Sequence, residues 1–166
     1  MNSRVRSLLA GLLSFLVAAS LFRYFNGAPT TTTLWTVAGG IILWTFPKGA
    51  LIRFMAGRRP YPSALLANAT SEISSLGFPL SPLGVPWPAL GASMFVSTII
   101  EAVALMVMGT ARAPACLVIS LYMNFFAHVF LVGWILWPDY HLVGGGVIFL
   151  SFLIFILPIF IVDRPV

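Results

Sequence analysis

The sequence predicts an all-α polytopic membrane protein, a bundle of about five transmembrane helices with one short interfacial helix in a single domain. Of its 166 residues, 60% are apolar and only 8% are charged, whereas a soluble domain carries about 25% charged residues. This number of charges is too small to form a water-facing shell. Lipid or other protein must therefore cover most of the surface. The apolar residues also fall into five runs suited to crossing a bilayer, at 7–25, 34–55, 87–108, 115–137 and 141–162.

Each of the first two runs has two possible interpretations. Run 7–25 follows two arginines, and we interpret it as a transmembrane helix, with a signal peptide as the alternative. Run 34–55 is interrupted by Pro47 and Lys48. The part before Pro47 reaches only about 20 Å, whereas the whole run reaches about 33 Å and crosses a ~30 Å hydrocarbon core. We therefore expect a helix kinked at Pro47, with Lys48 extending to the headgroups; a re-entrant half-helix ending at Pro47 is the alternative.

The connection 56–86 is the one long link between runs, and it contains five prolines. Within it, segment 63–76 repeats apolar residues at helical spacing behind a possible Ser63 cap. Its opposite face is polar, which suggests a helix lying flat at the cytoplasmic interface or packed over the mouth of the bundle. The apolar face comprises Leu65, Leu66, Ala69, Ile73 and Leu76, and the polar face comprises Asn68, Ser71, Glu72 and Ser75.

The third and fourth runs, 87–108 and 115–137, are joined by a short link and should form an antiparallel hairpin. Each carries polar residues at every fourth position, so each has one polar stripe. Polar residues within a membrane span are the main functional signal in a chain of this kind. The stripes are Ser93, Ser97 and Glu101 on the third run, and Ser120, Asn124 and His128 on the fourth.

Glu101 and Asn124 lie at a similar depth, about 10–14 Å from the hairpin turn, so their side chains can meet. A charged carboxylate without a partner at mid-membrane costs about 3 kcal/mol on insertion scales. Glu101 is therefore either protonated and hydrogen-bonded, most simply to Asn124, or paired with a cation or with a group of a partner subunit. We weigh a structural role, as polar contact within the hairpin, above a role in handling a proton, a cation or a polar substrate group.

His128 is the one histidine within the hairpin, and three phenylalanines are near it in the sequence. A membrane histidine can ligate haem iron or chlorophyll magnesium. Haem usually needs a second axial ligand, however, and the only other histidine, His141, is expected at an interface. We therefore favour a hydrogen-bonded histidine. The expected bound molecule is lipid. Cys116 is the single cysteine and nothing near it resembles a metal site, so we predict no metal centre.

Basic residues gather at the ends of the apolar runs, where they can contact phospholipid headgroups. This placement explains the net charge of +5 without a nucleic-acid partner. With a cytoplasmic N-terminus, six basic residues lie on the cytoplasmic side and three on the opposite side, which favours that orientation. The cytoplasmic set is Arg4, Arg6, Lys48, Arg53, Arg58 and Arg59, and the opposite set is Arg23, Arg112 and Arg164.

For function, two hypotheses remain. The first is an accessory or structural subunit of a larger membrane complex, which stabilises partner helices or bound lipids or pigments. The second is a small transporter, or a component of one, with a midplane polar site around Glu101, Asn124 and His128 and a gating element at Pro47. With two histidines, four acids and no paired catalytic groups, we do not expect an enzyme.

Overall fold

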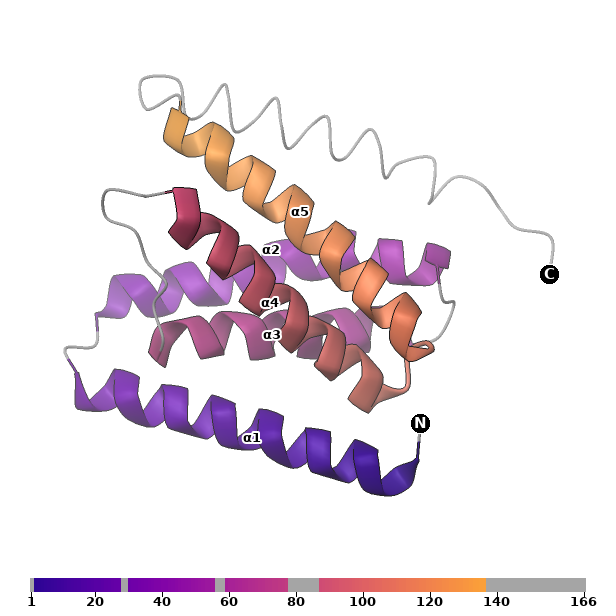
Figure 1. Ribbon diagram of the computed structural model, residues 1–166. Helices are drawn as coiled ribbons and strands as arrows, with labels where there is room; N and C mark the ends of the chain where they lie inside the picture. The colour runs from indigo at the N-terminus through magenta and orange to yellow at the C-terminus, as the bar shows by residue number, and fades with distance from the viewer. Residues whose placement is uncertain (1, 28–29, 56–58, 78–86, 137–166) are drawn as a thin grey trace.

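In a computed structural model, the structure describes residues 2–27, 30–55, 59–77 and 87–136, and it is helical apart from short connections (Figure 1). The predicted fifth run, 141–162, lies outside these residues. The helices are α1 (Ser3–Asn26), α2 (Thr31–Met55), α3 (Pro60–Gly77), α4 (Trp87–Met108) and α5 (Ala113–Leu136).

The apolar runs predicted at 7–25, 34–55, 87–108 and 115–137 coincide with α1, α2, α4 and α5. Within the part of the chain that the structure describes, three segments are long and apolar enough to cross a membrane, and α5 contributes a shorter apolar segment. These lengths and compositions indicate a membrane protein. The three long segments are Ser3–Asn26, Thr31–Met55 and Gly91–Met108, and the shorter one is Ala113–His128.

Helix α2 continues through Pro47 to Met55. A helix interior tolerates proline in a membrane protein because neighbouring helices and side chains can satisfy the backbone groups that the proline frees. The alternative of a half-helix that ends at Pro47 is therefore wrong, and the prediction of a continuous helix agrees with the structure.

The turn between α4 and α5 is fixed by Gly109, whose φ is +67°. The Gly109 amide donates to the Met106 carbonyl and the Thr110 amide donates to the Leu105 carbonyl, both at 3.0 Å. This pair of bonds is the Schellman motif, which needs a left-handed residue that glycine adopts without a steric penalty. The motif ends α4 abruptly and lets α5 return alongside it.

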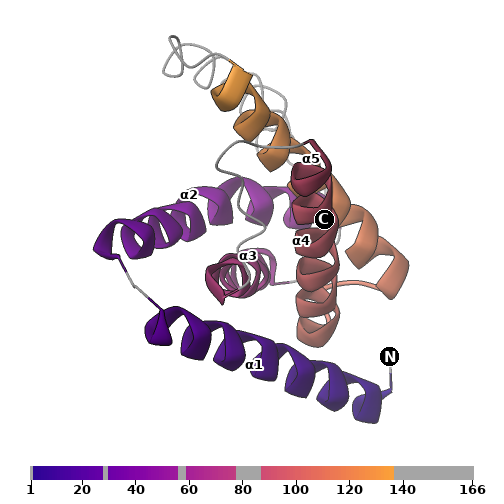
Figure 2. The ribbon, with the colours of Figure 1, turned by 60° about the vertical axis from the view of Figure 1, so that its left-hand side comes forward.

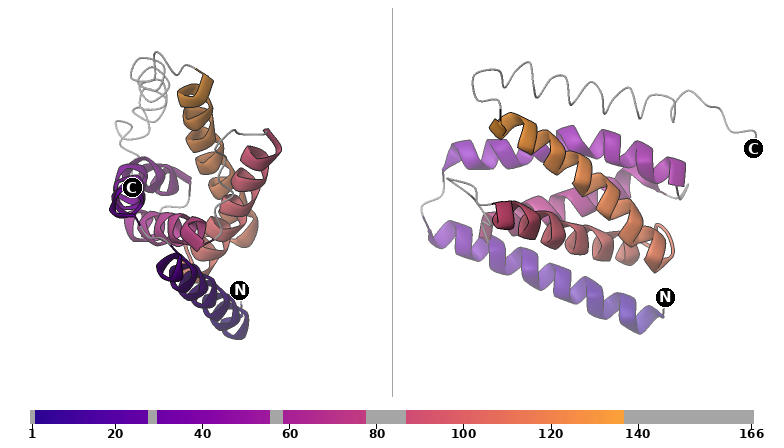
Figure 3. Two further views of the ribbon diagram at one scale, coloured as in Figure 1. Left: turned by 90° about the vertical axis from the view of Figure 1, so that its left-hand side faces the viewer. Right: turned by 45° about the horizontal axis from the view of Figure 1, so that its top comes forward.

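Helix α3 lies in the middle of the bundle, packed against α1, α2 and α4 (Figures 2 and 3). Hydrogen bonds locate both of its ends. Near its start, Ser63 Oγ accepts from Thr110 Oγ1 at 2.7 Å; near its end, the Ser74 carbonyl accepts from Ser20 Oγ of α1 at 3.3 Å. Because these two contacts lie at opposite ends of α3, the helix runs along the bundle and not across its mouth, while its position relative to a membrane interface stays a prediction.

The face of α3 that points inward is the one made of small and polar residues. Ala64, Ala67 and Asn68 are fully buried, whereas Leu65 and Leu66 are 49% and 39% exposed. This is the reverse of the amphipathic orientation expected from the sequence. Between membrane helices, large apolar side chains gain nothing by turning inward, while small residues allow close approach and polar residues find partners.

A core of apolar side chains holds α2, α3, α4 and α5 together. Most of its members are small or medium-sized, which suits closely approaching helices. By contrast, the only residue of α1 that is buried within the bundle is Ser20. The core comprises Leu51, Ile52, Ala64, Ala67, Ala104, Leu105, Cys116, Ile119 and Met123.

One end of the bundle is strongly basic, and it includes the N-terminus of α1 (right in Figure 1). Because α3 runs the length of the bundle, the turn between α4 and α5 returns to this same end, and Arg112 comes with it. Assigning Arg112 to the side opposite the N-terminus was therefore wrong. Four residues predicted to contact headgroups lie at this end and are exposed, while Arg58 lies outside the described residues. The four are Arg4, Arg6, Arg53 and Arg59.

Candidate functional site

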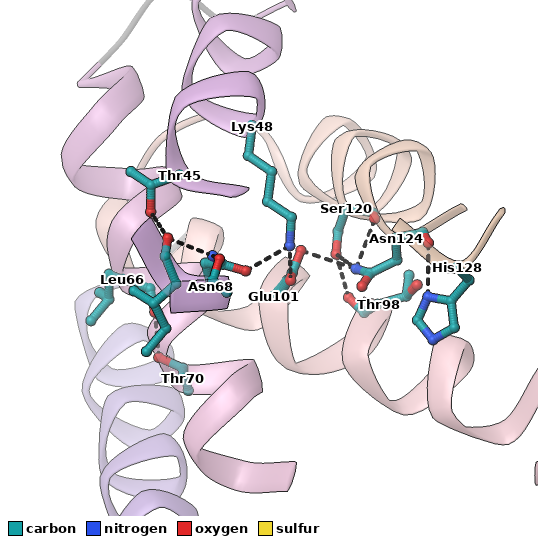
Figure 4. Close-up of polar contacts among 12 residues, drawn as sticks. Thr45, Lys48, Leu66, Asn68, Thr70, Thr98, Glu101, Ser120, Asn124 and His128 are labelled. Atoms are coloured by element: carbon teal, nitrogen blue, oxygen red, sulfur yellow. Dashed lines mark hydrogen bonds and ion pairs between the residues drawn. The ribbon is translucent and has the colours of Figure 1, made fainter. Parts of the chain in front are cut away.

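The centre of the bundle contains an ion pair between Lys48 of α2 and Glu101 of α4, with 2.5 Å between Nζ and Oε1 (Figure 4). The two side chains are only 4% and 1% exposed. From the sequence we expect Lys48 to extend to the headgroups, but its ammonium lies inside the bundle. Its ammonium points inward because a carboxylate there offers a Coulomb attraction that strengthens where water is excluded.

Two asparagines complete the coordination of this ion pair. The Lys48 ammonium donates to Asn68 Oδ1 of α3 at 2.9 Å, and Asn124 Nδ2 of α5 donates to Glu101 Oε2 at 2.9 Å. Asn68 Nδ2 in turn donates to the Ile41 carbonyl of α2 at 2.9 Å. The four side chains Lys48, Asn68, Glu101 and Asn124, which we call the polar cluster, thus connect four helices.

The meeting of Glu101 and Asn124 agrees with the depth argument from the hairpin, but the proton arrangement differs. Asn124 is the donor and Glu101 the acceptor, and the nearby ammonium favours an ionised carboxylate. Of the arrangements considered for Glu101, the structure contains pairing with a cation. A buried charge pair of this kind needs such additional hydrogen bonds to offset the cost of removing both ions from water.

The polar contacts extend along the α4–α5 hairpin. Asn124 Nδ2 also donates to the Ser120 carbonyl at 3.0 Å, and Ser120 Oγ donates to the Thr98 carbonyl at 2.7 Å. Among the described residues, Thr98 Oγ1 is a buried oxygen without a hydrogen-bond partner. Ser120 therefore belongs to the network as expected, and Thr98 joins it on α4.

His128 contacts the network through the backbone only. Its Nδ1 lies 2.8 Å from the Asn124 carbonyl oxygen, which can only accept, so Nδ1 carries the proton. The hydrogen bond agrees with the favoured expectation of a hydrogen-bonded histidine. Among the described residues, no group of three metal-ligating side chains is present, and ligation of haem or chlorophyll by His128 stays the less favoured, untested alternative.

Ser97 lies apart from the polar cluster, although it precedes Glu101 by four residues. It lines a largely apolar cavity of about 410 Å³ between α1, α3 and α4, together with Leu16 and Ser71. Four residues rotate a helix by one turn plus about 40°, so a stripe at this spacing winds around the helix. Ser97 consequently lies towards α1 and α3, whereas the backbone carbonyl of Thr98 accepts from Ser120 of α5.

Two members of the site were not singled out by the sequence, namely Asn68 and its neighbour Glu72 one turn later on α3. Glu72 is half-buried, and its carboxylate packs against Gly40 of α2, where an added Cβ would lie 3.7 Å from Oε1. It also interacts electrostatically with both Lys48 and Glu101. The sequence does contain a signal for these two residues: Asn68 and Glu72 are an amide and an acid four residues apart, so they share one face of a helix in a chain with few charges.

Removing the Asn124 amide tests whether the polar cluster stabilises the fold. In Asn124→Ala, Glu101 Oε2 loses its donor in a buried position, so we expect the free energy of unfolding to fall by about 1–3 kcal/mol. Ser97→Ala is the matched control on the same hairpin, and it should change stability by less than about 0.5 kcal/mol. Titration with sodium dodecyl sulfate in mixed micelles measures both. Equal losses in the two variants would contradict the assignment of Asn124 to the cluster and Ser97 outside it.

Comparison of the chain with protein-family models, with curated proteins and with solved structures finds no match.

Proposed function

We propose that the protein is an accessory or structural subunit of a larger membrane protein complex, crossing the bilayer several times with its N-terminus in the cytoplasm. The observation that supports this proposal best is the closed state of the polar cluster. Lys48 and Glu101 are paired with each other and capped by two asparagines, and both are almost fully buried. Such a cluster fixes the relative positions of four helices without offering a group to a substrate.

The exposed apolar surface of α1 also supports the subunit proposal. Phe15, Phe22 and Phe25 are 74%, 73% and 59% exposed, while α1 has a single buried residue within this chain. Large apolar side chains on a membrane helix contact lipid or the helices of other chains. Of the three long apolar segments, α1 has the smallest buried share, so in a subunit it leaves more of its length free for a partner chain than the other two.

The orientation follows from the charges at the two ends of the bundle. Arg4, Arg6, Arg53, Arg59 and Arg112 belong to the end that holds the N-terminus of α1, and Arg23 belongs to the end of α1 on the other side. The positive-inside rule places the end rich in arginine in the cytoplasm.

Purification from native membranes in a mild detergent tests the subunit proposal. We expect a complex of defined stoichiometry by native mass spectrometry, containing at least one other membrane protein. The double variant Phe15→Ala/Phe22→Ala should reduce the yield of that complex, since truncation of aromatic anchors weakens interfaces strongly. Trp35→Ala, which removes a similarly exposed aromatic residue from α2, should leave the yield unchanged. A monomer without companions in native membranes would contradict the proposal.

Transport is the second candidate function, and Glu72 is the observation that favours it. The interior contains two carboxylates, those of Glu72 and Glu101, for the single ammonium of Lys48. Exchange of the lysine ammonium between the two carboxylates would move a proton or a cation through the bundle. In proteoliposomes, ion flux that is lost in both Glu72→Gln and Glu101→Gln would favour transport, and absence of flux in the wild type would count against it.

A further inference from the structure

A second cavity lies at the basic end of the bundle, directly beside the turn between α4 and α5.

 It measures about 390 Å³ and differs from the cavity beside Ser97 in being lined mainly by polar groups. Its walls come from the start of α1, the residue before α3 and the end of α4. The lining residues are Arg6, Arg59, Met108, Gly109 and Thr110.

The two arginines of this cavity bring two positive charges together, and no acid within residues 2–27, 30–55, 59–77 and 87–136 pairs with them. Among the described residues, neither guanidinium forms an ion pair or a hydrogen bond, and the acids Glu72 and Glu101 belong to the interior of the bundle. Each guanidinium presents five N–H donors in a planar fork that matches the oxygens of a phosphate. Two unpaired forks at one cavity therefore favour a phosphate-bearing anion.

The backbone holds both side chains at the cavity. Arg6 packs over the turn between α4 and α5, where a Cβ added to Gly109 would lie 3.2 Å from an Arg6 guanidinium nitrogen. Arg59 has a φ of +40°, a left-handed conformation that is uncommon for a residue other than glycine. Its carbonyl accepts from the Ser63 amide at 3.1 Å, which joins this conformation to the first turn of α3.

We propose that Arg6 and Arg59 form a binding site for a phosphate group, supplied either by a phospholipid headgroup or by a soluble phosphate. The positive ends of the α1 and α3 dipoles lie at the same end of the bundle and add to the attraction. This site is independent of the proposed subunit function, because it depends only on the local geometry of one chain.

Binding is tested on the full chain in an uncharged maltoside detergent, with thermal unfolding followed by tryptophan fluorescence. Three additives are compared: dihexanoyl phosphatidylglycerol, inorganic phosphate, and dihexanoylglycerol, which lacks phosphate. We expect at least one phosphate-bearing additive to stabilise the wild type and the phosphate-free lipid to have no such effect. Arg6→Gln and Arg59→Gln should each weaken binding about ten-fold, since each removes a charge-assisted contact. Arg4→Gln, an exposed arginine two residues from Arg6 and outside the cavity, should stay within about two-fold of the wild type.

The outcomes separate the two sources of phosphate. A response to the lipid alone assigns the site to a headgroup, and a response to inorganic phosphate assigns it to a soluble anion. The proposal is overturned if the wild type responds to neither, or if Arg4→Gln weakens binding as much as Arg6→Gln. Should the glutamine variants not fold, modification of wild-type arginines by phenylglyoxal replaces them: the bound additive must protect Arg6 and Arg59 but not Arg4.

Discussion

Glu101→Gln and Lys48→Met will each lower the free energy of unfolding by about 3–5 kcal/mol, because each leaves one buried charge without its partner. The pair is 1–4% exposed, so water cannot replace the lost ion. For Glu101→Gln this expectation depends on the ion pair: if Glu101 were a protonated acid bonded to Asn124 alone, a neutral amide would replace it at little cost. The size of the loss therefore reports the charge state of the cluster.

The double variant Lys48→Met/Glu101→Gln makes this test sharper. With both charges removed together, no unpaired ion remains, so the double variant should be more stable than the sum of the single losses predicts by about 2 kcal/mol or more. Detergent titration followed by circular dichroism measures all three. Arg112→Gln, which removes an exposed charge, should change stability by less than about 0.5 kcal/mol. Additive losses in the double variant would show that the two charges do not stabilise each other.

Gly49→Ala will lower the free energy of unfolding by about 1–3 kcal/mol, although alanine is the better helix former. Gly49 of α2 is buried against the Tyr61 ring of α3, and an added Cβ would lie 2.8 Å from Cε1 and 3.2 Å from Cγ. Because the near side of the ring is involved, the whole side chain must move, and α2 and α3 share the most extensive contact of any pair of described helices.

The matched control for this prediction is Gly39→Ala, on the same helix. An added Cβ at Gly39 meets nothing within 4 Å, so the change should be neutral or stabilise the protein by up to about 1 kcal/mol through helix propensity. Tyr61→Ala should relieve the strain of Gly49→Ala, so the double variant should be less destabilised than the two single losses together. A loss in Gly39→Ala equal to that in Gly49→Ala would mean that helix propensity, and not contact with α3, decides both.

The hairpin shows how much of the site the sequence could predict. Glu101 and Asn124 meet because both their spacing from the turn and the antiparallel direction of α4 and α5 are local properties. Lys48 and Asn68 join them from α2 and α3, which are distant in sequence, and no periodicity within one helix relates them to Glu101. The sequence therefore predicted two of the four members of the polar cluster and did not identify Lys48 as the cation that pairs with Glu101.

The sequence by itself determined the helical character, the apolar runs and the continuous path of α2. These properties are set by the thickness and the apolar character of the bilayer, which constrain the composition and length of each run. Only the tertiary structure decided the place of α3. Its amphipathic pattern was interpreted as if water faced its polar side, whereas Asn68 is buried and Leu65 is exposed. In lipid the hydrophobic effect does not sort the two faces of a helix, so hydrogen bonding and close approach do, and these depend on partners that only folding brings together.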